Sequence, residues 1–316
     1  MNSYTPITLP YFAPADSLPG PLPTQEEVLA ATDLLAPPIA GKDILVVRVG
    51  QHFVAKYGRD VRTIEGENMI FVKQHTTIPI AQVYALYTFD ESRSMIIMEF
   101  IPGLSLDYCI QSMEPERLEA VRKKLEAQVA ELRRIPAPPN YYGSIGQRPL
   151  VDLVRDCKVG PFDNSSDFAK SFVGLRFPPL SGQRFDDFRK EFSTRLDDVS
   201  TALGHSQPVF THNDLYPGNV IVRPDDTPLI IDYELAGFYP AYQERITTDM
   251  MMELDDCEFE FLEESFPDEQ KVISDAEKAF VKALREEMIE SDAQSAPEAE
   301  SPSEGGGCEE VNNETN

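Results

Sequence analysis

The most constraining feature of the sequence is an apolar run that breaks for a few polar residues and then resumes. In FTHNDLYPGNVIV the break contains His212, Asp214 and Asn219. A second apolar run, PLII, follows a short DDT turn, and Asp232 comes directly after it in PLIIDYE. Two strands joined by so short a turn form a hairpin, and residues that flank a hairpin meet at its open end. The pattern therefore predicts that Asn219 and Asp232 lie close together, near Asp214.

These residue types suit chemistry on phosphate groups. Asp214 can accept a hydrogen bond from an attacking hydroxyl, and Asn219 and Asp232 offer the hard oxygen atoms that Mg²⁺ prefers. Taken singly, Asp214 fits a turn and Asn219 a left-handed loop position. A carboxylate that ends an apolar strand needs a cation or a metal, so Asp232 is harder to explain that way. The ordered set favours a nucleotide site, with His212 holding the loop by hydrogen bonds.

Short strand-like runs alternate with turns through the first third of the chain. DILVVRV and HFVAKYG, separated by Gly50 and Gln51, indicate a hairpin, and AQVYALYTFD and SMIIMEFI indicate two further strands. Between the two pairs, IEGENMIFVKQHT has apolar residues at helical spacing. The sequence therefore predicts a small strand-rich unit that contains one helix.

This unit supplies the cation that a phosphate site needs. Lys56, in FVAKYG, lies on the strand after the hairpin turn, where its ammonium can hold α- and β-phosphate oxygens. A lysine in that place needs an acidic partner on the following helix. Glu65 is our choice because it lies whole turns before apolar positions of that helix, and the spacing leaves Glu67 open.

The segment MEFIPG marks the boundary between the strand-rich unit and a larger helical one. Met98, Glu99 and Phe100 are the residues that we expect to offer backbone groups to the base of a nucleotide. Farther along, PERLEAVRKKLEAQVAELRRI predicts a long amphipathic helix that begins at Pro115. Weaker helical patterns lie at residues 167–173, 186–203 and 274–289.

These patterns divide the chain into four segments. Residues 1–40 are expected to form a Pro-rich extended arm with a short helix at TQEEVLAATDLL, and residues 41–102 the strand-rich lobe. Residues 103–290 are expected to form the helical lobe. The tail, residues 291–316, is acidic and poor in apolar residues, which predicts disorder.

Composition excludes several classes of partner. The chain has 316 residues and a net charge of −26, and most of that charge lies after residue 252. No basic stripe is present to bind a nucleic-acid backbone, and no apolar run is long enough to cross a membrane. The 4 cysteines form no CxxC pair and no export signal precedes them, so we expect free thiols and a cytoplasmic protein.

Taken in order, FVAKYG, the acidic helix, MEFIPG, HNDLYPGN and IIDYELAGFYP resemble the aminoglycoside phosphotransferase-like family, over roughly residues 41–250. This branch of the protein-kinase-like fold includes antibiotic, choline and homoserine kinases. The resemblance implies an α+β, bilobal fold with a small β-rich amino-terminal lobe and a larger, mainly helical carboxy-terminal lobe. It also implies a kinase in which Asp214 is catalytic, Asn219 and Asp232 bind Mg²⁺, ATP or GTP is the donor, and a small hydroxylated molecule is the acceptor.

Departures from the protein-kinase pattern narrow the hypothesis. No GxGxxG precedes Lys56, Asn213 replaces the usual Arg between His and Asp, and Asp232-Tyr233-Glu234 replaces DFG. These differences favour a small-molecule kinase over a protein Ser/Thr kinase. The missing Gly-rich loop leaves a second hypothesis, a catalytically weak pseudokinase that serves as a binding scaffold.

Overall fold

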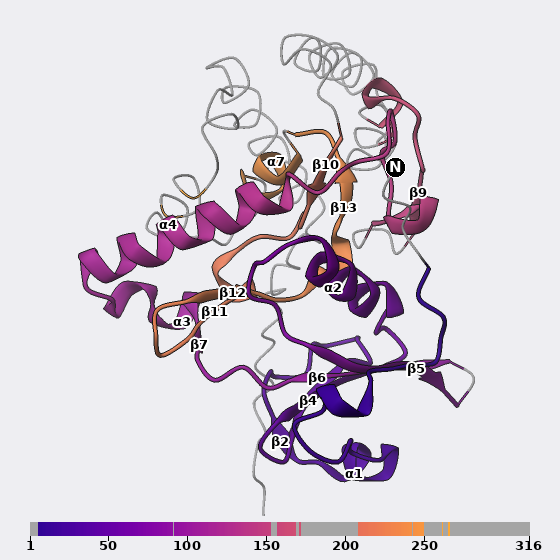
Figure 1. The fold of residues 1–316 in the computed structure, drawn as a ribbon, viewed down its shortest axis with the longest axis vertical. Coiled ribbons are helices and arrows are strands. Elements are labelled where there is room, and N and C mark those ends of the chain that lie inside the picture. Colours follow the sequence, from indigo (N-terminus) through magenta and orange to yellow (C-terminus); the bar gives the residue numbers. More distant parts are fainter. Residues whose placement is uncertain are drawn as a thin grey trace, which may run out of the picture.

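The fold is known from a computed structural model (Figure 1). It describes residues 6–90, 92–152, 157–168, 208–241 and 243–249, together with residues 171, 261 and 265. The helices predicted at residues 186–203 and 274–289, and the acidic tail, lie outside the described residues. The helix predicted at residues 167–173 lies only partly within them.

A six-stranded antiparallel sheet forms the amino-terminal part of the fold, with the strand order β1-β5-β6-β4-β3-β2. The hairpin β3–β4 and the pair β5–β6 are the strands predicted from the sequence. The strands are β1 (Tyr11–Phe12), β2 (Asp33–Leu34), β3 (Leu45–Val49), β4 (Phe53–Gly58), β5 (Val83–Phe89) and β6 (Arg93–Glu99).

Alternation along β4 assigns its side chains to two cores, because successive residues of a strand point to opposite faces. Phe53, Ala55 and Tyr57 pack in a cluster on the outer face of the sheet. Lys56 lies on the inner face, toward helix α2 (Thr63–His75), which covers that face (Figure 1). This alternation directs the ammonium of Lys56 into the molecule.

The segment before residue 41, predicted as an extended arm, is built into the sheet. It supplies both edge strands, β1 and β2, and its helix α1 (Gln25–Ala30) lies on the far side of the sheet from α2 (Figure 1). Thr24 and Glu27 cap this helix reciprocally: the Thr24 side chain accepts from the backbone N–H of Glu27, and the Glu27 carboxylate accepts from the backbone N–H of Thr24. The helix ends earlier than the pattern suggests, because the chain after it pairs with β3. Val28 is fully buried against the outer face.

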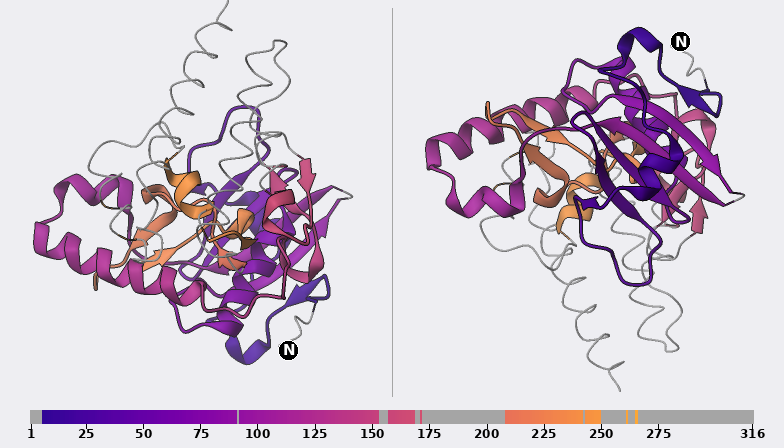
Figure 2. Two further views of the ribbon diagram at one scale, coloured as in Figure 1. Left: turned by 90° about the horizontal axis from the view of Figure 1, so that it is seen from above. Right: turned by 90° about the horizontal axis from the view of Figure 1, so that it is seen from below.

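The carboxy-terminal part combines helices with short antiparallel strand pairs. Helix α4 (Pro115–Leu132) runs beside the orange strands in both views of Figure 2. Gln128 of this helix donates a hydrogen bond to the carbonyl oxygen of Pro228 at 2.8 Å. The other strands and α-helices of the described residues are β7 (Leu104–Ser105), α3 (Leu106–Cys109), β8 (Leu150–Asp152), β9 (Cys157–Val159), β10 (Val209–Thr211), β11 (Val220–Val222), β12 (Pro228–Ile230), β13 (Gly237–Tyr239) and α7 (Gln243–Asp249).

The predicted hairpin is present as β11 and β12, with Val220 opposite Ile230. The pairing continues one step beyond the strands, where the backbone N–H of Ile231 donates to the carbonyl oxygen of Asn219 at 2.9 Å. Asn219 and the residue before Asp232 therefore meet at the open end of the hairpin.

One continuous hydrophobic core joins the two parts. It contains Phe71 of α2 together with Phe210 and Phe238 of the carboxy-terminal strands. The ring centroids of Phe71 and Phe210 lie 5.3 Å apart, and those of Phe210 and Phe238 lie 5.4 Å apart. Helix α2 is thus packed between the amino-terminal sheet and the carboxy-terminal strands. No helix among the described residues combines the length and apolar character needed to span a membrane.

The burial of α1 generates a stability prediction. Val28→Ala removes buried methyl groups and leaves a cavity, so it should lower the free energy of unfolding by about 1–3 kcal/mol. Leu29→Ala, at the neighbouring position that is 41% exposed, should change it by less than about 0.5 kcal/mol. Urea unfolding of the two variants measures the difference. Equal effects would show that the amino-terminal segment is not part of the core.

Candidate active site

Lys56 is the centre of the site. Its Nζ lies 2.7 Å from Oε2 of Glu65 and 3.0 Å from Oδ1 of Asp232. The side chains of Lys56 and Glu65 are buried, whereas that of Asp232 is 36% exposed. The ammonium from β4 therefore joins α2 to the loop after β12, and one end of this network reaches solvent.

The structure separates the two glutamates that the sequence left open. Glu65 contacts Lys56, whereas both carboxylate oxygens of Glu67 accept hydrogen bonds from Arg148 at 3.1 and 2.8 Å. Side chains two residues apart on a helix point in nearly opposite directions, so only one of the two glutamates can face the ammonium. Glu65 is the one that does.

Burial and the neighbouring charges shift the pKa values of this ion pair in opposite directions. Burial by itself lowers the pKa of Lys56, but the carboxylates of Glu65 and Asp232 outweigh it and raise the pKa above its usual value. Burial raises the pKa of Glu65, while the Lys56 ammonium lowers it. The 2.7 Å contact with an ammonium that keeps its proton favours the ionised carboxylate.

Asp214 and Asn219 form a second pair. The amide nitrogen of Asn219 donates to Oδ2 and to the backbone oxygen of Asp214, both at 2.9 Å. Burial raises the pKa of Asp214 to about 7, the charge of Asp232 adds to the rise, and the hydrogen bond from Asn219 opposes it. A carboxyl group with a pKa near neutrality is suited to exchange a proton with a hydroxyl.

The loop that carries Asp214 is tied to the loop that carries Asp232. The Nε2 atom of His212, a buried residue, lies 2.9 Å from the carbonyl oxygen of Ile231. Asp232 itself has a left-handed backbone, with φ of 62° and ψ of 61°, which turns the chain sharply at the end of β12. His212 thus has the loop-holding contact expected of it, and Tyr233 and Phe238 pack in the core.

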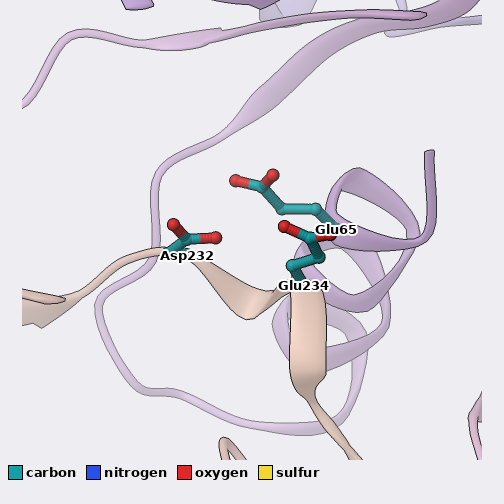
Figure 3. Close-up of side chains that lie close together, drawn as sticks. All are labelled: Glu65, Asp232 and Glu234. Carbon is teal, nitrogen blue, oxygen red and sulfur yellow. The ribbon is translucent and has the colours of Figure 1, made fainter. Parts of the chain in front are cut away.

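A carboxylate cluster surrounds the ammonium. Oxygen atoms of Glu65, Asp232 and Glu234 lie within 4.8 Å of one another, and Figure 3 shows the three side chains converging. Arg62, just before α2, forms an ion pair with Glu234. In the sequence, Glu234 stands out only as the last residue of the triplet that replaces DFG, and Arg62 carries no signal, because nothing in the local pattern links residues so far apart.

The donor atoms present fit a magnesium ion. The amide oxygen of Asn219 and the second carboxylate oxygen of Asp232 form no hydrogen bond within the part of the chain that the structure describes. Both are hard oxygen ligands, and carboxylate and amide oxygens are the donors that Mg²⁺ accepts in proteins. The cluster supplies the negative charge that such a cation needs nearby.

The predicted base contacts lie at the end of β6 and just after it: Met98 and Glu99 are the last residues of the strand, and Phe100 follows them. The backbone N–H of Glu99 donates to the carbonyl of Gln82 at 2.9 Å, and that of Phe100 donates to His52 at 2.8 Å. These two donors are therefore engaged within the amino-terminal sheet. Within the described residues the buried Ile101 donates no backbone hydrogen bond, which makes it the available donor. The sequence signal for it was the boundary segment MEFIPG, in which Ile101 precedes Pro102.

A protein-family model and several solved structures are similar to this chain. A family model described as the phosphotransferase enzyme family (APH) matches residues 45–248. No curated protein matches the chain.

Several solved structures share the fold. A thermostable mutant of aminoglycoside phosphotransferase APH(4)-Ia has 16% identity and a TM-score of 0.55, covering 86% of this chain and 92% of that one. ADP-bound APH(2'')-Ib has 15% identity and a TM-score of 0.54, with coverage of 85% and 87%. A GDP and kanamycin complex of APH(2'')-IIIa has 14% identity and a TM-score of 0.52, with coverage of 83% and 89%. At such identities these likenesses establish the fold.

The resemblance drawn from the motifs is thereby confirmed. The matched region contains Lys56, Glu65, Asp214, Asn219 and Asp232, and it spans well over half of the sequence. The chain belongs to the phosphotransferase enzyme family.

Proposed function

We propose that the chain is a small-molecule kinase that transfers the terminal phosphoryl group of ATP or GTP to a hydroxyl group. The observation that carries the proposal is the convergence on one buried ammonium: Lys56 contacts Glu65 and Asp232, and the loop bearing Asp232 is bonded to the loop bearing Asp214. Phosphoryl transfer requires little beyond such positioned charges.

The donor nucleotide would lie between the two parts of the fold, which act as the two lobes of a kinase. Lys56 is placed to bind phosphate oxygens, and Ile101 offers a free backbone donor for the base near Met98, Glu99 and Phe100. Two solved relatives of the same fold are ADP and GDP complexes, which supports a purine nucleotide.

Asn219 and Asp232 would hold Mg²⁺, which when bound neutralises charge on the transferring phosphate. Asp214 orients the acceptor hydroxyl and accepts its proton as the oxygen bonds to phosphorus and the nucleoside diphosphate leaves. Asn219 fixes the direction of the Asp214 carboxylate through the hydrogen bond at 2.9 Å. Each of these side chains comes from a loop held at both ends by backbone pairing.

Removing the proposed base generates the first test of function. Asp214→Ala should lower turnover by about 10²–10⁴-fold, because the hydroxyl loses its proton acceptor. Nucleotide binding should persist, since Lys56 remains. The assay is Mg·ATP consumption with amino alcohols, sugars, aminoglycosides and hydroxy amino acids as acceptors, together with thermal shift in Mg·ATP.

The matched control is Asp225→Ala, at the opposite end of the β11–β12 hairpin, where the aspartate is hydrogen-bonded to Thr227. It should leave turnover unchanged. Undiminished turnover in Asp214→Ala would remove Asp214 from its role. A wild-type protein that shows no thermal shift and no ATP consumption would favour the binding scaffold, and labelling of a generic protein substrate would favour a protein kinase.

The raised pKa of the Asp214 carboxyl predicts that the stability of the fold depends on pH. The folded pKa of Asp214, about 7, exceeds the usual 3.8, so its ionised form destabilises the fold, fully above pH 7 and not at all below about pH 4. In metal-free buffer, Asp214→Asn should therefore raise the free energy of unfolding at pH 8 by about 1–3 kcal/mol. The gain should vanish toward pH 4. Urea titrations across this range measure it, and a pH-independent gain would contradict the assignment.

A further inference from the structure

Glu67 is a buried carboxylate on the side of α2 that faces away from Lys56. Its side chain is only 5% exposed, and it lies two residues after Glu65, so the two carboxylates leave the helix in nearly opposite directions. An ionised group inside a protein is unfavourable unless a cation accompanies it. Glu67 therefore needs a cationic partner of its own, separate from the Lys56 ammonium.

The partner is the guanidinium of Arg148. Its terminal nitrogens, Nη1 and Nη2, donate to Oε1 and Oε2 of Glu67 at 3.1 and 2.8 Å. Two parallel hydrogen bonds between a planar guanidinium and a planar carboxylate fix the direction of the contact as well as its distance. A single ammonium in the same place would leave the carboxylate free to turn. Arg148 therefore restrains the rotation of α2 about its axis.

Arg148 is itself held in a short turn. Its Nε donates to the carbonyl oxygen of Ile145 at 3.0 Å. Its own carbonyl oxygen accepts from the backbone N–H of Ser144 at 2.8 Å and from the hydroxyl of Tyr141 at 3.1 Å. Because both its backbone and its guanidinium are fixed by the turn, the side chain loses little further freedom when it binds Glu67.

The turn is attached to the segment that follows Asp232. Gly143, just before the turn, exchanges two backbone hydrogen bonds with Phe238 of β13, at 3.0 and 2.9 Å. Strand β13 begins a few residues after Asp232. The contacts therefore close a ring, which runs from Asp232 through Lys56 into α2 and returns through Arg148 to β13.

Helix α2 is thus held on two opposite sides. Lys56 of the amino-terminal sheet contacts Glu65 at 2.7 Å. On the other side, Arg148 of the carboxy-terminal part contacts Glu67. A rotation of the helix that releases one carboxylate also moves the other away from its partner. The contact between Glu65 and Lys56 therefore depends on an ion pair that lies outside the candidate site.

We propose that Arg148 is a positioning residue: by holding Glu67, it fixes the rotation of α2 that brings Glu65 to the ammonium. The inference deepens the proposed function and rests on it for the role of Lys56 in phosphate binding. A displacement of about 1 Å in a catalytic group can lower a rate by about 10²-fold, so the contribution of Arg148 should appear in turnover. Its contribution to the order of the helix can be measured without any activity.

The first experiment separates positioning from neutralisation of a buried charge. Arg148→Ala leaves the Glu67 carboxylate buried without its guanidinium, so Tm should fall by about 5 °C or more and kcat by at least about tenfold. Arg148→Ala combined with Glu67→Gln removes the buried charge and should recover most of the Tm. In Mg·ATP consumption, kcat of this double variant should nevertheless stay at least about tenfold below the wild type. Recovery of kcat together with Tm would overturn the proposal, because only the charge would then matter.

The matched control is Arg117→Ala. The side chain of Arg117, on α4, is 47% exposed, against 42% for Arg148, and it also forms an ion pair, with Asp226. This variant removes an arginine of similar exposure without touching α2, so kcat should stay within about twofold of the wild type. A fall in kcat equal to that of Arg148→Ala would contradict a specific role for Arg148.

The second experiment measures α2 directly, by amide hydrogen exchange of the whole protein without nucleotide. In the double variant, the amides of residues 69–72 should exchange about tenfold faster than in the wild type, while those of α4 at residues 121–129 keep their rates. Arg148→Lys keeps the charge but loses the paired hydrogen bonds, so it should fold and show a smaller increase confined to α2. Unchanged exchange in α2 in every folded variant, or an equal increase in α4, would overturn the proposal.

The outcomes distinguish failure of the kinase assignment from failure of the positioning role. If the wild type neither binds nor consumes Mg·ATP, the kinase assignment fails, and hydrogen exchange in α2 still decides whether Arg148 holds the helix. If the wild type is active and the double variant matches it in kcat, the kinase assignment stands and the positioning role is wrong.

Discussion

The structure depends on how the fold accommodates one buried ammonium. A charge inside a protein is costly unless paired, and Lys56 is paired with two carboxylates that come from different elements. For this pairing, β4 must present Lys56 on its inner face, α2 must turn Glu65 toward it, and the chain must bend at Asp232. The register of β4 between β3 and β6 fixes the first condition. The left-handed backbone of Asp232 fixes the last.

Helix α2 connects the two parts of the fold through more than its apolar face. The side-chain amide of the buried Asn68 donates to the carbonyl oxygens of Tyr233 at 2.8 Å and Ala236 at 3.1 Å. Arg62 and Glu67 add ion pairs to the carboxy-terminal part. The helix that carries Glu65 is therefore fastened directly to the segment that follows Asp232, which couples the position of the ammonium to that of the candidate metal ligands.

The candidate site concentrates negative charge and compensates it only in part. Lys56 and Arg62 offset the carboxylates of Glu65, Asp232 and Glu234, while Asp214 carries a raised pKa because it is buried beside them. Such an arrangement is unfavourable for folding and favourable for binding a divalent cation with a polyphosphate. Local rules of sequence and stability are broken at functional sites for this reason.

The sequence by itself determined the elements whose signals are local: the strands and helix of the amino-terminal sheet, α4, and the β11–β12 hairpin that brings Asn219 toward Asp232. It also determined the family, because the order of the motifs is a property of the chain. Tertiary structure decided what depends on contacts between distant residues. It selected Glu65 over Glu67 as the partner of Lys56, built the amino-terminal segment into the sheet edges, and gave Glu234 to Arg62. It also placed the guanidinium of Arg148 at the carboxylate of Glu67. Periodicity reports which face of an element is apolar, whereas the partner of a buried polar group is set by packing between segments far apart in the chain.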